Sequence, residues 1–428
     1  MRFRRNAVTS PRMASSIRGG GPVSLGFDLP RTAVEETIKG RPRTNGDVGR
    51  PRPVQQPAED PLLHVSKPKP ARESFAFRLK PRDIKRHLDR FVVRQDDAKK
   101  VLSVALCDHF QHVRMTREGD VAPHYVKQNV LILGPTGVGK THLIRSAAEL
   151  IGVPFVKADA TKFSETGYVG GDVEELVRDL VRKANGDTER AAHGIVYLDE
   201  IDKIASRESG SRDVSGRGVQ TNLLKLMEDA DVAVQPPGEA AAPSAPRARE
   251  QTINTRHVLF IASGAFAGLD EVVRRRTGAA ADCDPAALAA RATTRDFIEF
   301  GFEPEFVGRL PVRVACKALD ADDLFHVMRD SESSVLRQYE RAFRAYGISV
   351  RFMDAGLRRI AEHAASENTG ARGLMTVCER VLRDFKFELP SSRARELVVD
   401  REVVDDPAGA LRRLLRRRLP RPTGSPRV

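Results

Sequence analysis

Short apolar runs alternate with amphipathic stretches through the middle of the chain. Four of these runs have the length and the Val, Ile, Leu and Phe content of buried strands: residues 129–133, 153–156, 194–200 and 257–263. Between them, apolar residues recur at helical spacing and predict helices over residues 142–150, 172–183 and 219–229. Alternating strands and helices of this length predict a doubly wound α/β domain with a parallel sheet between helices.

The flanking segments are helical in pattern. Ahead of the first strand, the sequence predicts a helix that starts near residue 80 and a second helix over residues 100–113. From about residue 315 the chain becomes mainly helical, with one long helix over 320–346, a short strand over 348–352, and helices over 354–366 and 371–389. The Gly/Ser-rich stretch 206–218 and the Pro/Ala-rich stretch 236–252 are predicted to be loops.

Composition divides the chain into four parts. We interpret residues 1–74 as a disordered basic Pro/Arg-rich region, 75–314 as a large α/β domain, 315–405 as a smaller, mostly helical α+β domain, and 406–428 as a basic tail. The net charge of +13 lies mainly at the ends, with +7 in residues 1–75 and +5 in residues 391–428. Solvated basic tails are favoured over a nucleic-acid surface for these ends, although a nucleic-acid role stays open.

Several protein classes are not expected from the composition. Apolar residues make up 40% and charged residues 30% of the chain, and no apolar run reaches the 18 or so residues that a membrane span needs. The first 16 residues carry arginines without an apolar segment, so no secretory signal is predicted. The four cysteines are far apart and form no C-x-x-C pair, which indicates a reducing, cytoplasmic location and argues against a zinc site built from cysteines.

The most specific motif follows the first strand of the α/β domain. It reads G-x-x-x-x-G-K-[ST] between that strand and the next helix, and its eight residues are Gly134, Pro135, Thr136, Gly137, Val138, Gly139, Lys140 and Thr141. Its glycines allow backbone N–H groups to surround anionic oxygens, and the helix N-terminus favours negative charge. Lys140 suits the β- and γ-phosphates of ATP, and the hydroxyl of Thr141 suits Mg²⁺.

Two carboxylates close a later apolar strand. Asp199 and Glu200 follow four apolar residues directly, and the carboxyl ends of parallel strands are where ligands bind. If the loop binds ATP, Asp199 can hold Mg²⁺, directly or through water, and Glu200 can polarise the water that attacks the γ-phosphate.

The span from about 75 to 400 resembles the ClpX-like AAA+ unfoldases, which include HslU. The resemblance rests on the phosphate-binding loop and on six further stretches: 91–95, 158–170, 195–203, 212–216, 302–311 and 369–374. It implies a hexameric ATPase that uses ATP and Mg²⁺ to unfold or remodel tagged or unfolded proteins by threading them through a pore. The length of the chain between the phosphate-binding loop and Asp199 favours the ClpX branch, because HslU has a large insertion there.

The resemblance also implies roles for single residues. Arg309 matches the arginine that reaches the γ-phosphate of a neighbouring subunit, and Arg372 matches the arginine that senses nucleotide in its own subunit. Ser263 matches the first polar sensor residue. Two further pairs complete the set, with Val92 and Val93 matching the adenine pocket and Tyr168 and Val169 matching the pore loop that grips polypeptide. Residues 212–220 match a second pore loop.

Four departures from the family pattern limit these implications. The N-terminal zinc-binding domain with paired C-x-x-C is absent, and so is the basic Arg-Lys-His loop at the pore entrance. No Ile-Gly-Phe tripeptide occurs between Leu269 and Phe297, which argues against docking to the ClpP peptidase. Arg94 stands beside the adenine pocket where the family usually has glycine.

Three other functions remain open from the sequence. The chain could be the ATPase regulatory subunit of a protease that docks by another surface, a nucleic-acid motor or loader that uses the basic ends, or a nucleotide switch or scaffold without hydrolysis. The presence of Asp199, Glu200, Arg309 and Arg372 favours a hydrolysing enzyme over a switch.

Overall fold

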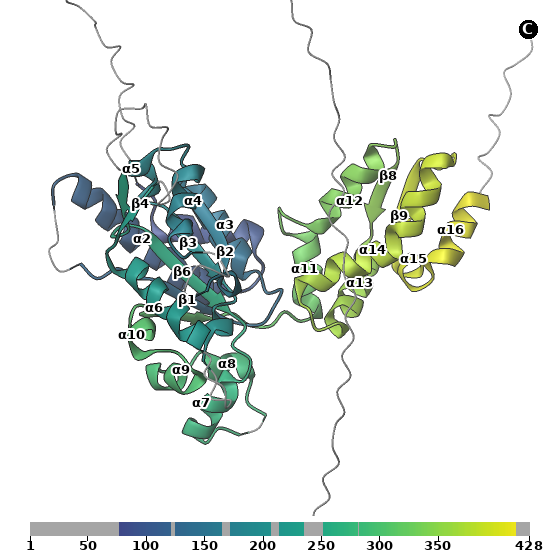
Figure 1. The fold of residues 1–428 in the computed structure, drawn as a ribbon. Coiled ribbons are helices and arrows are strands. Elements are labelled where there is room, and N and C mark those ends of the chain that lie inside the picture. The colour runs from purple at the N-terminus through teal and green to yellow at the C-terminus, as the bar shows by residue number, and fades with distance from the viewer. Residues whose placement is uncertain are drawn as a thin grey trace, which may run out of the picture. The chain divides into compact units, whose positions relative to one another are not determined.

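The computed structural model describes residues 77–120, 125–164, 172–206, 214–234, 251–280 and 282–416 (Figure 1). All of them belong to one unit that spans residues 72–428. No helix in these ranges is both long and apolar enough to cross a membrane.

A five-stranded parallel sheet forms the centre of the N-terminal part. Its strands follow the order β2-β3-β6-β1-β7, so that β1 lies between two strands that come later in the chain. Their bounds are β1 Val130–Leu133, β2 Phe155–Asp159, β3 Ile195–Asp199, β6 Leu259–Gly264 and β7 Val312–Ala315. A separate antiparallel pair is formed by β4 Asp231–Ala233 and β5 Thr252–Asn254.

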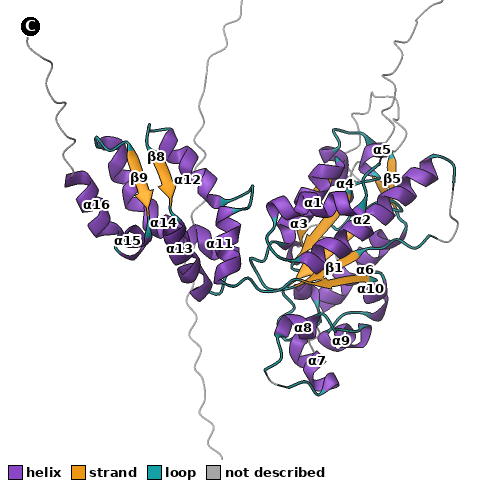
Figure 2. Ribbon diagram, turned by 180° about the vertical axis from the view of Figure 1, so that it is seen from behind, coloured by secondary structure: helices purple, strands orange, loops and turns teal. Residues whose placement is uncertain are grey.

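Helices cover both faces of this sheet (Figure 2). Because side chains alternate along a strand, Val130 and Ile132 of β1 pack on one side, while Leu131 and Leu133 pack on the other. The first side is covered by α1 Pro81–Phe91, α2 Asp96–Arg117 and α3 Lys140–Ile151. The second is covered by α4 Glu175–Lys183, α6 Val214–Glu228, α9 Thr294–Phe300 and α10 Pro304–Gly308. The predicted α/β fold with a parallel sheet between helices is confirmed.

Shorter elements complete the N-terminal part. They are η1 Ala160–Lys162, α5 Thr188–Ala191, η2 Ile201–Ile204, α7 Leu269–Thr277 and α8 Pro285–Ala289. The helices α7, α8 and α9 occupy most of the stretch where the sequence lacks the Ile-Gly-Phe tripeptide.

The C-terminal part has its own apolar core and is mostly helical, as predicted. A parallel pair of short strands, β8 Ser349–Phe352 and β9 Glu396–Val399, packs with the helices of this part. The helices are α11 Ala321–Arg329, α12 Val335–Arg344, α13 Asp354–Ser366, α14 Ala371–Glu388, η3 Leu389–Ser391, α15 Arg401–Asp405 and α16 Pro407–Arg416.

The structure corrects the single long helix predicted over 320–346. It is two helices, because Ser331 and Ser334 interrupt the pattern with hydrogen bonds of their own. The Ser331 hydroxyl donates to the Phe91 carbonyl at 2.7 Å, and the Ser334 hydroxyl donates to the Met328 carbonyl at 2.5 Å. Serine hydroxyls that bond the backbone in this way compete with the helical ladder.

Two further boundaries were predicted wrongly. Residues 214–218 belong to α6 and not to a loop, since the glycines of this stretch are tolerated inside a helix that contacts η2 and α10. Strand β2 begins at Phe155 and not at Val153, because Pro154 has no N–H for the ladder; its carbonyl still accepts from the N–H of Ile195 at 2.9 Å.

Candidate functional site

The phosphate-binding motif forms the turn between β1 and α3, as the sequence predicts. Gly134, Gly137 and Gly139 have φ values of 143°, 79° and 96°, which favour glycine. The ammonium of Lys140 donates to the Gly134 carbonyl at 2.6 Å and to the Pro135 carbonyl at 2.8 Å. Burial lowers the pKa of Lys140, and nearby acidic groups oppose that shift. The lysine is thus turned back onto its own loop.

Asp199 lies at the centre of a polar cluster at the end of β3. One of its carboxylate oxygens, Oδ2, accepts from the Thr141 hydroxyl at 3.2 Å, and the other, Oδ1, accepts from the Ser263 hydroxyl at 2.9 Å. Burial acts to raise the pKa of Asp199, but hydrogen bonds from Lys157 and Ser263 outweigh it, so the pKa lies below its ordinary value. The carboxylate is therefore ionised at neutral pH, which suits a metal ligand.

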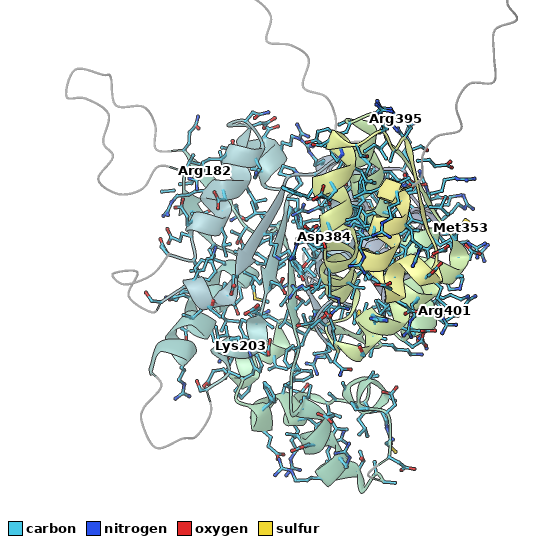
Figure 3. All side chains as sticks on the ribbon, turned by 90° about the vertical axis from the view of Figure 1, so that its right-hand side faces the viewer. Arg182, Lys203, Met353, Asp384, Arg395 and Arg401 are labelled. Carbon is cyan, nitrogen blue, oxygen red and sulfur yellow. The ribbon has the colours of Figure 1, made fainter. Side chains whose placement is uncertain are left out.

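Glu200 follows directly and presents its side chain to solvent. Its backbone has a φ of 57°, in the left-handed region, where a non-glycine residue is uncommon. This turn ends β3 and starts η2, which carries the buried Asp202 and the exposed Lys203. Lys203 is labelled in Figure 3. Asp202 accepts from the N–H of Ala265 at 3.2 Å and so ties η2 to the end of β6.

These side chains surround one cavity of about 380 Å³. The lining comes from the phosphate-binding loop, the ends of β3 and β6, and the start of α14: Thr136, Gly137, Gly139, Lys140, Thr141, His142, Asp199, Glu200, Asp202, Lys203, Gly264, Ala265, Ala371 and Arg372. The backbone N–H of Ala371 donates to the carbonyl of Gly137 at 2.9 Å. A glycine-rich loop at a helix N-terminus, a hydroxyl and an ionised carboxylate fit ATP with Mg²⁺.

Arg309 does not line this cavity. It caps α10, is exposed, and forms an ion pair with Glu228 of α6 at 2.5 Å. The structure therefore brings together the phosphate-binding loop, Asp199, Glu200, Ser263 and Arg372, and leaves Arg309 outside.

The segment predicted to hold adenine lies beside the phosphate-binding loop. Val92 is buried, and its Cγ1 lies 3.4 Å from where a side chain at Gly139 would begin, whereas Val93 is half-buried. Neither residue lines the cavity described above. Arg94 has a φ of 58°, which accounts for the glycine usual at this position, and its guanidinium pairs with Asp320 at 3.0 Å and with Asp323.

The residues predicted for the two pore loops lie partly outside the described residues. Tyr168 and Val169 lie outside the described residues, and so does Arg212. The remainder of the second predicted pore loop, from Val214, is the first part of helix α6. Its Gln220 is buried and donates to the Ile204 carbonyl at 2.9 Å, which is a packing role.

Several residues of the site were not predicted from the sequence; besides the three described next, they are His142, Asp202, Gly264, Ala265 and Ala371 of the cavity lining. Tyr197 bonds the hydroxyl of Ser263 at 2.6 Å, and Lys203 lines the cavity. Lys157 of β2 forms an ion pair with Asp199 at 2.8 Å. Lys157 and Tyr197 are partners in the β2–β3 register, and both point toward α3. Alternation along each strand could have placed each side chain on one face of the sheet, but it gives no information on this pairing.

Gly137 provides a test of the loop. Its φ of +79° matches the +78° of Gly152, but a Cβ on Gly137 would lie 2.1 Å from the Thr369 carbonyl, whereas one on Gly152 would meet nothing within 4 Å. We expect Gly137→Ala to weaken nucleotide binding by about tenfold or more, since it adds a clash to the strain of a left-handed alanine. Titration with a fluorescent ATP analogue measures this. Gly152→Ala introduces the same backbone strain without the clash and is the control. Equal losses of nucleotide affinity in both variants would contradict the role of the loop.

Comparison with known proteins agrees with this geometry. A family model described as "AAA domain (Cdc48 subfamily)" matches residues 126–313. The chain is 40% identical over 333 residues to the "ATP-dependent Clp protease ATP-binding subunit ClpX" of Borrelia duttonii, covering 74% of this chain and 76% of that protein. It is 40% identical over 353 residues to "ClpX 3" of Methylococcus capsulatus, covering 77% and 81%. For ClpX of Treponema denticola the identity is 37% over 340 residues, covering 76% and 81%.

The parallel sheet, the phosphate-binding loop and the paired acidic residues, together with the family match, define a AAA ATPase. At this identity and coverage the chain belongs to the ClpX family of these ATPases. It is an ATP-hydrolysing unfoldase of that family, with ATP and Mg²⁺ as its cofactors.

Proposed function

We propose that this chain assembles into a ring of identical subunits, a hexamer, and threads unfolded or tagged polypeptides through the central pore. The observation that carries the proposal is the position of Arg309. Its guanidinium pairs with Glu228, outside the cavity that the phosphate-binding loop, Asp199, Glu200 and Arg372 line. A planar, permanently charged group suits a γ-phosphate. We therefore assign Arg309 to the nucleotide of a neighbouring subunit.

Within each subunit, the residues that line the cavity have separate roles in ATP hydrolysis. Lys140 would leave the carbonyls of its loop and neutralise phosphate oxygens, while Thr141 and Asp199 would hold Mg²⁺. Bound ATP and Mg²⁺ supply the transferable phosphoryl group and the charge that neutralises it. Glu200 orients the attacking water and accepts its proton. Positioning and electrostatics contribute most of the rate enhancement in this chemistry.

The contact between the phosphate-binding loop and α14 can transmit the effect of ATP hydrolysis to the C-terminal helices. Ala371 donates its backbone N–H to Gly137, and Arg372 lines the same cavity. A change in the loop therefore reaches the C-terminal helices directly. We propose that this movement drives the loop that carries Tyr168 along the pore, where the aromatic ring grips polypeptide without reading its sequence.

The second candidate function is that of a protease regulatory subunit. The relatives are named as ATP-binding subunits of a Clp protease. In this chain the stretch between Leu269 and Phe297 lacks the Ile-Gly-Phe tripeptide. We therefore propose remodelling without peptidase docking through that tripeptide.

An unfolding assay tests these proposals. A tagged fluorescent reporter is incubated with the full chain and ATP, with and without a ClpP peptidase, while reporter fluorescence and phosphate release are followed. We expect loss of fluorescence in both arms and no faster degradation with the peptidase. Degradation that depends on both proteins would establish the regulatory-subunit function instead.

We expect Tyr168→Ala to raise the number of ATP molecules hydrolysed per reporter molecule unfolded by about two- to tenfold. This factor corresponds to the free energy of one aromatic contact. The control is Tyr346→Ala, since Tyr346 is an exposed tyrosine of the C-terminal part. If the two variants show the same coupling, the assignment of the pore loop to Tyr168 is wrong.

A further inference from the structure

Lys157 lies where the metal is expected. It belongs to β2 and faces the side of the sheet covered by α3, next to Tyr197 in the register. Its ammonium nitrogen lies 2.8 Å from Asp199 Oδ2 and 3.4 Å from the Thr141 hydroxyl. A single cationic group thus contacts both side chains that are assigned to Mg²⁺.

Lys140, the lysine of the phosphate-binding motif, is not the cation that contacts these two side chains. Lys140 donates to the carbonyls of Gly134 and Pro135, and Asp199 is 16% exposed at its side chain. An ionised carboxylate at this depth requires a compensating charge. In the described part of the chain, Lys157 is the cation in contact with it. The positive charge beside Asp199 therefore comes from the second strand and not from the phosphate-binding loop.

The ammonium and a metal ion cannot occupy the position together. Asp199 and Thr141 would hold the metal, and the ammonium already contacts both of them; like charges this close repel each other strongly where water is partly excluded. Lys157 can leave, because its side chain is 36% exposed and its four-carbon stem is flexible.

We propose that Lys157 is an internal substitute for the metal: it neutralises Asp199 while the site is empty, and Mg²⁺ enters in competition with its ammonium. The inference rests on the assignment of this cavity to ATP and Mg²⁺ and adds a regulatory property to it. The empty site is held in a stable, neutral arrangement, and metal-dependent nucleotide binding begins only at a higher Mg²⁺ concentration than the carboxylate and hydroxyl alone would need.

The test compares the full-length wild type with Lys157→Met, a substitution of similar size that removes the charge. Lys162→Met is the matched control, because Lys162 is an exposed lysine of η1, five residues further along the chain. Binding of a fluorescent ADP analogue is titrated with Mg²⁺, starting in EDTA. We expect the Mg²⁺ concentration at half-maximal binding to fall about three- to tenfold in Lys157→Met and to stay unchanged in Lys162→Met.

A second measurement needs no nucleotide. The thermal unfolding temperature is recorded in EDTA and in millimolar Mg²⁺. The proposal requires Lys157→Met to melt below the wild type in EDTA and to gain more from Mg²⁺ than the wild type does. Lys157→Arg keeps the charge and should behave as the wild type in both measurements, and Lys157→Gln replaces the methionine variant if that variant does not fold.

An unchanged Mg²⁺ midpoint in Lys157→Met, together with an equal melting shift, overturns the proposal. A wild type that does not bind the ADP analogue at any Mg²⁺ concentration overturns the nucleotide assignment instead. In that case the melting shifts with Mg²⁺ alone still decide the role of Lys157.

Discussion

Replacing Glu200 with glutamine is expected to reduce ATP hydrolysis by about 100-fold or more while ATP binding is retained. The amide keeps the size of the side chain but cannot accept the proton of the attacking water, and general base catalysis contributes about 10²- to 10⁴-fold. Glu200 is exposed at a left-handed turn and forms part of the cavity lining, so its loss leaves no buried partner unsatisfied. Phosphate release at saturating ATP and titration with a fluorescent ATP analogue measure the two properties.

Glu149→Gln is the control for this change. Glu149 is exposed on the same helix as Lys140, two residues before the end that is distant from the phosphate-binding loop. This variant should hydrolyse ATP at the wild-type rate. Normal turnover in Glu200→Gln would refute the assignment of Glu200 as the base, and loss of ATP binding would indicate a structural role for the carboxylate.

The parts of the cavity lining whose position in the fold follows from the sequence are local segments of the chain. The phosphate-binding loop and the pair Asp199 and Glu200 each follow a strand directly, so the local pattern placed them at the carboxyl edge of the sheet. The same local logic identified the two C-terminal helices α13 and α14, whose apolar periodicity is not interrupted by competing side chains.

The parts that were not predicted depend on pairing between distant segments. The ion pair of Lys157 with Asp199 exists only because β2 and β3 are neighbours in a register that no local pattern reveals. The contact of Glu228 with Arg309 joins residues 81 positions apart. The break in the helix predicted over 320–346 has a similar origin, because Ser331 bonds the carbonyl of Phe91, which lies 240 residues earlier.

Replacing Arg309 with alanine is expected to reduce ATP hydrolysis by about 10³-fold, the effect of losing an arginine that stabilises phosphoryl transfer. ATP binding within the subunit should be retained, because Arg309 lies outside the cavity lining of its own chain. Glu228→Gln removes the partner of the ion pair and keeps the arginine. Since that pair is half-exposed, this control should change stability by no more than about 1 kcal/mol and leave hydrolysis in place.

Mixing two inactive variants separates action within a subunit from action between subunits. Arg309→Ala retains Glu200 and needs an arginine from its neighbour, whereas Glu200→Gln retains Arg309 and can supply it. If Arg309 serves the neighbouring subunit, rings assembled from both variants contain interfaces with a complete set of groups, and hydrolysis returns. If Arg309 acted within its own chain, every subunit in the mixture would lack one group, and hydrolysis would stay at the level of the separate variants. Recovery of activity on mixing is therefore the expected result, and it would require the subunits to form a ring or another assembly in which one chain completes the site of the next.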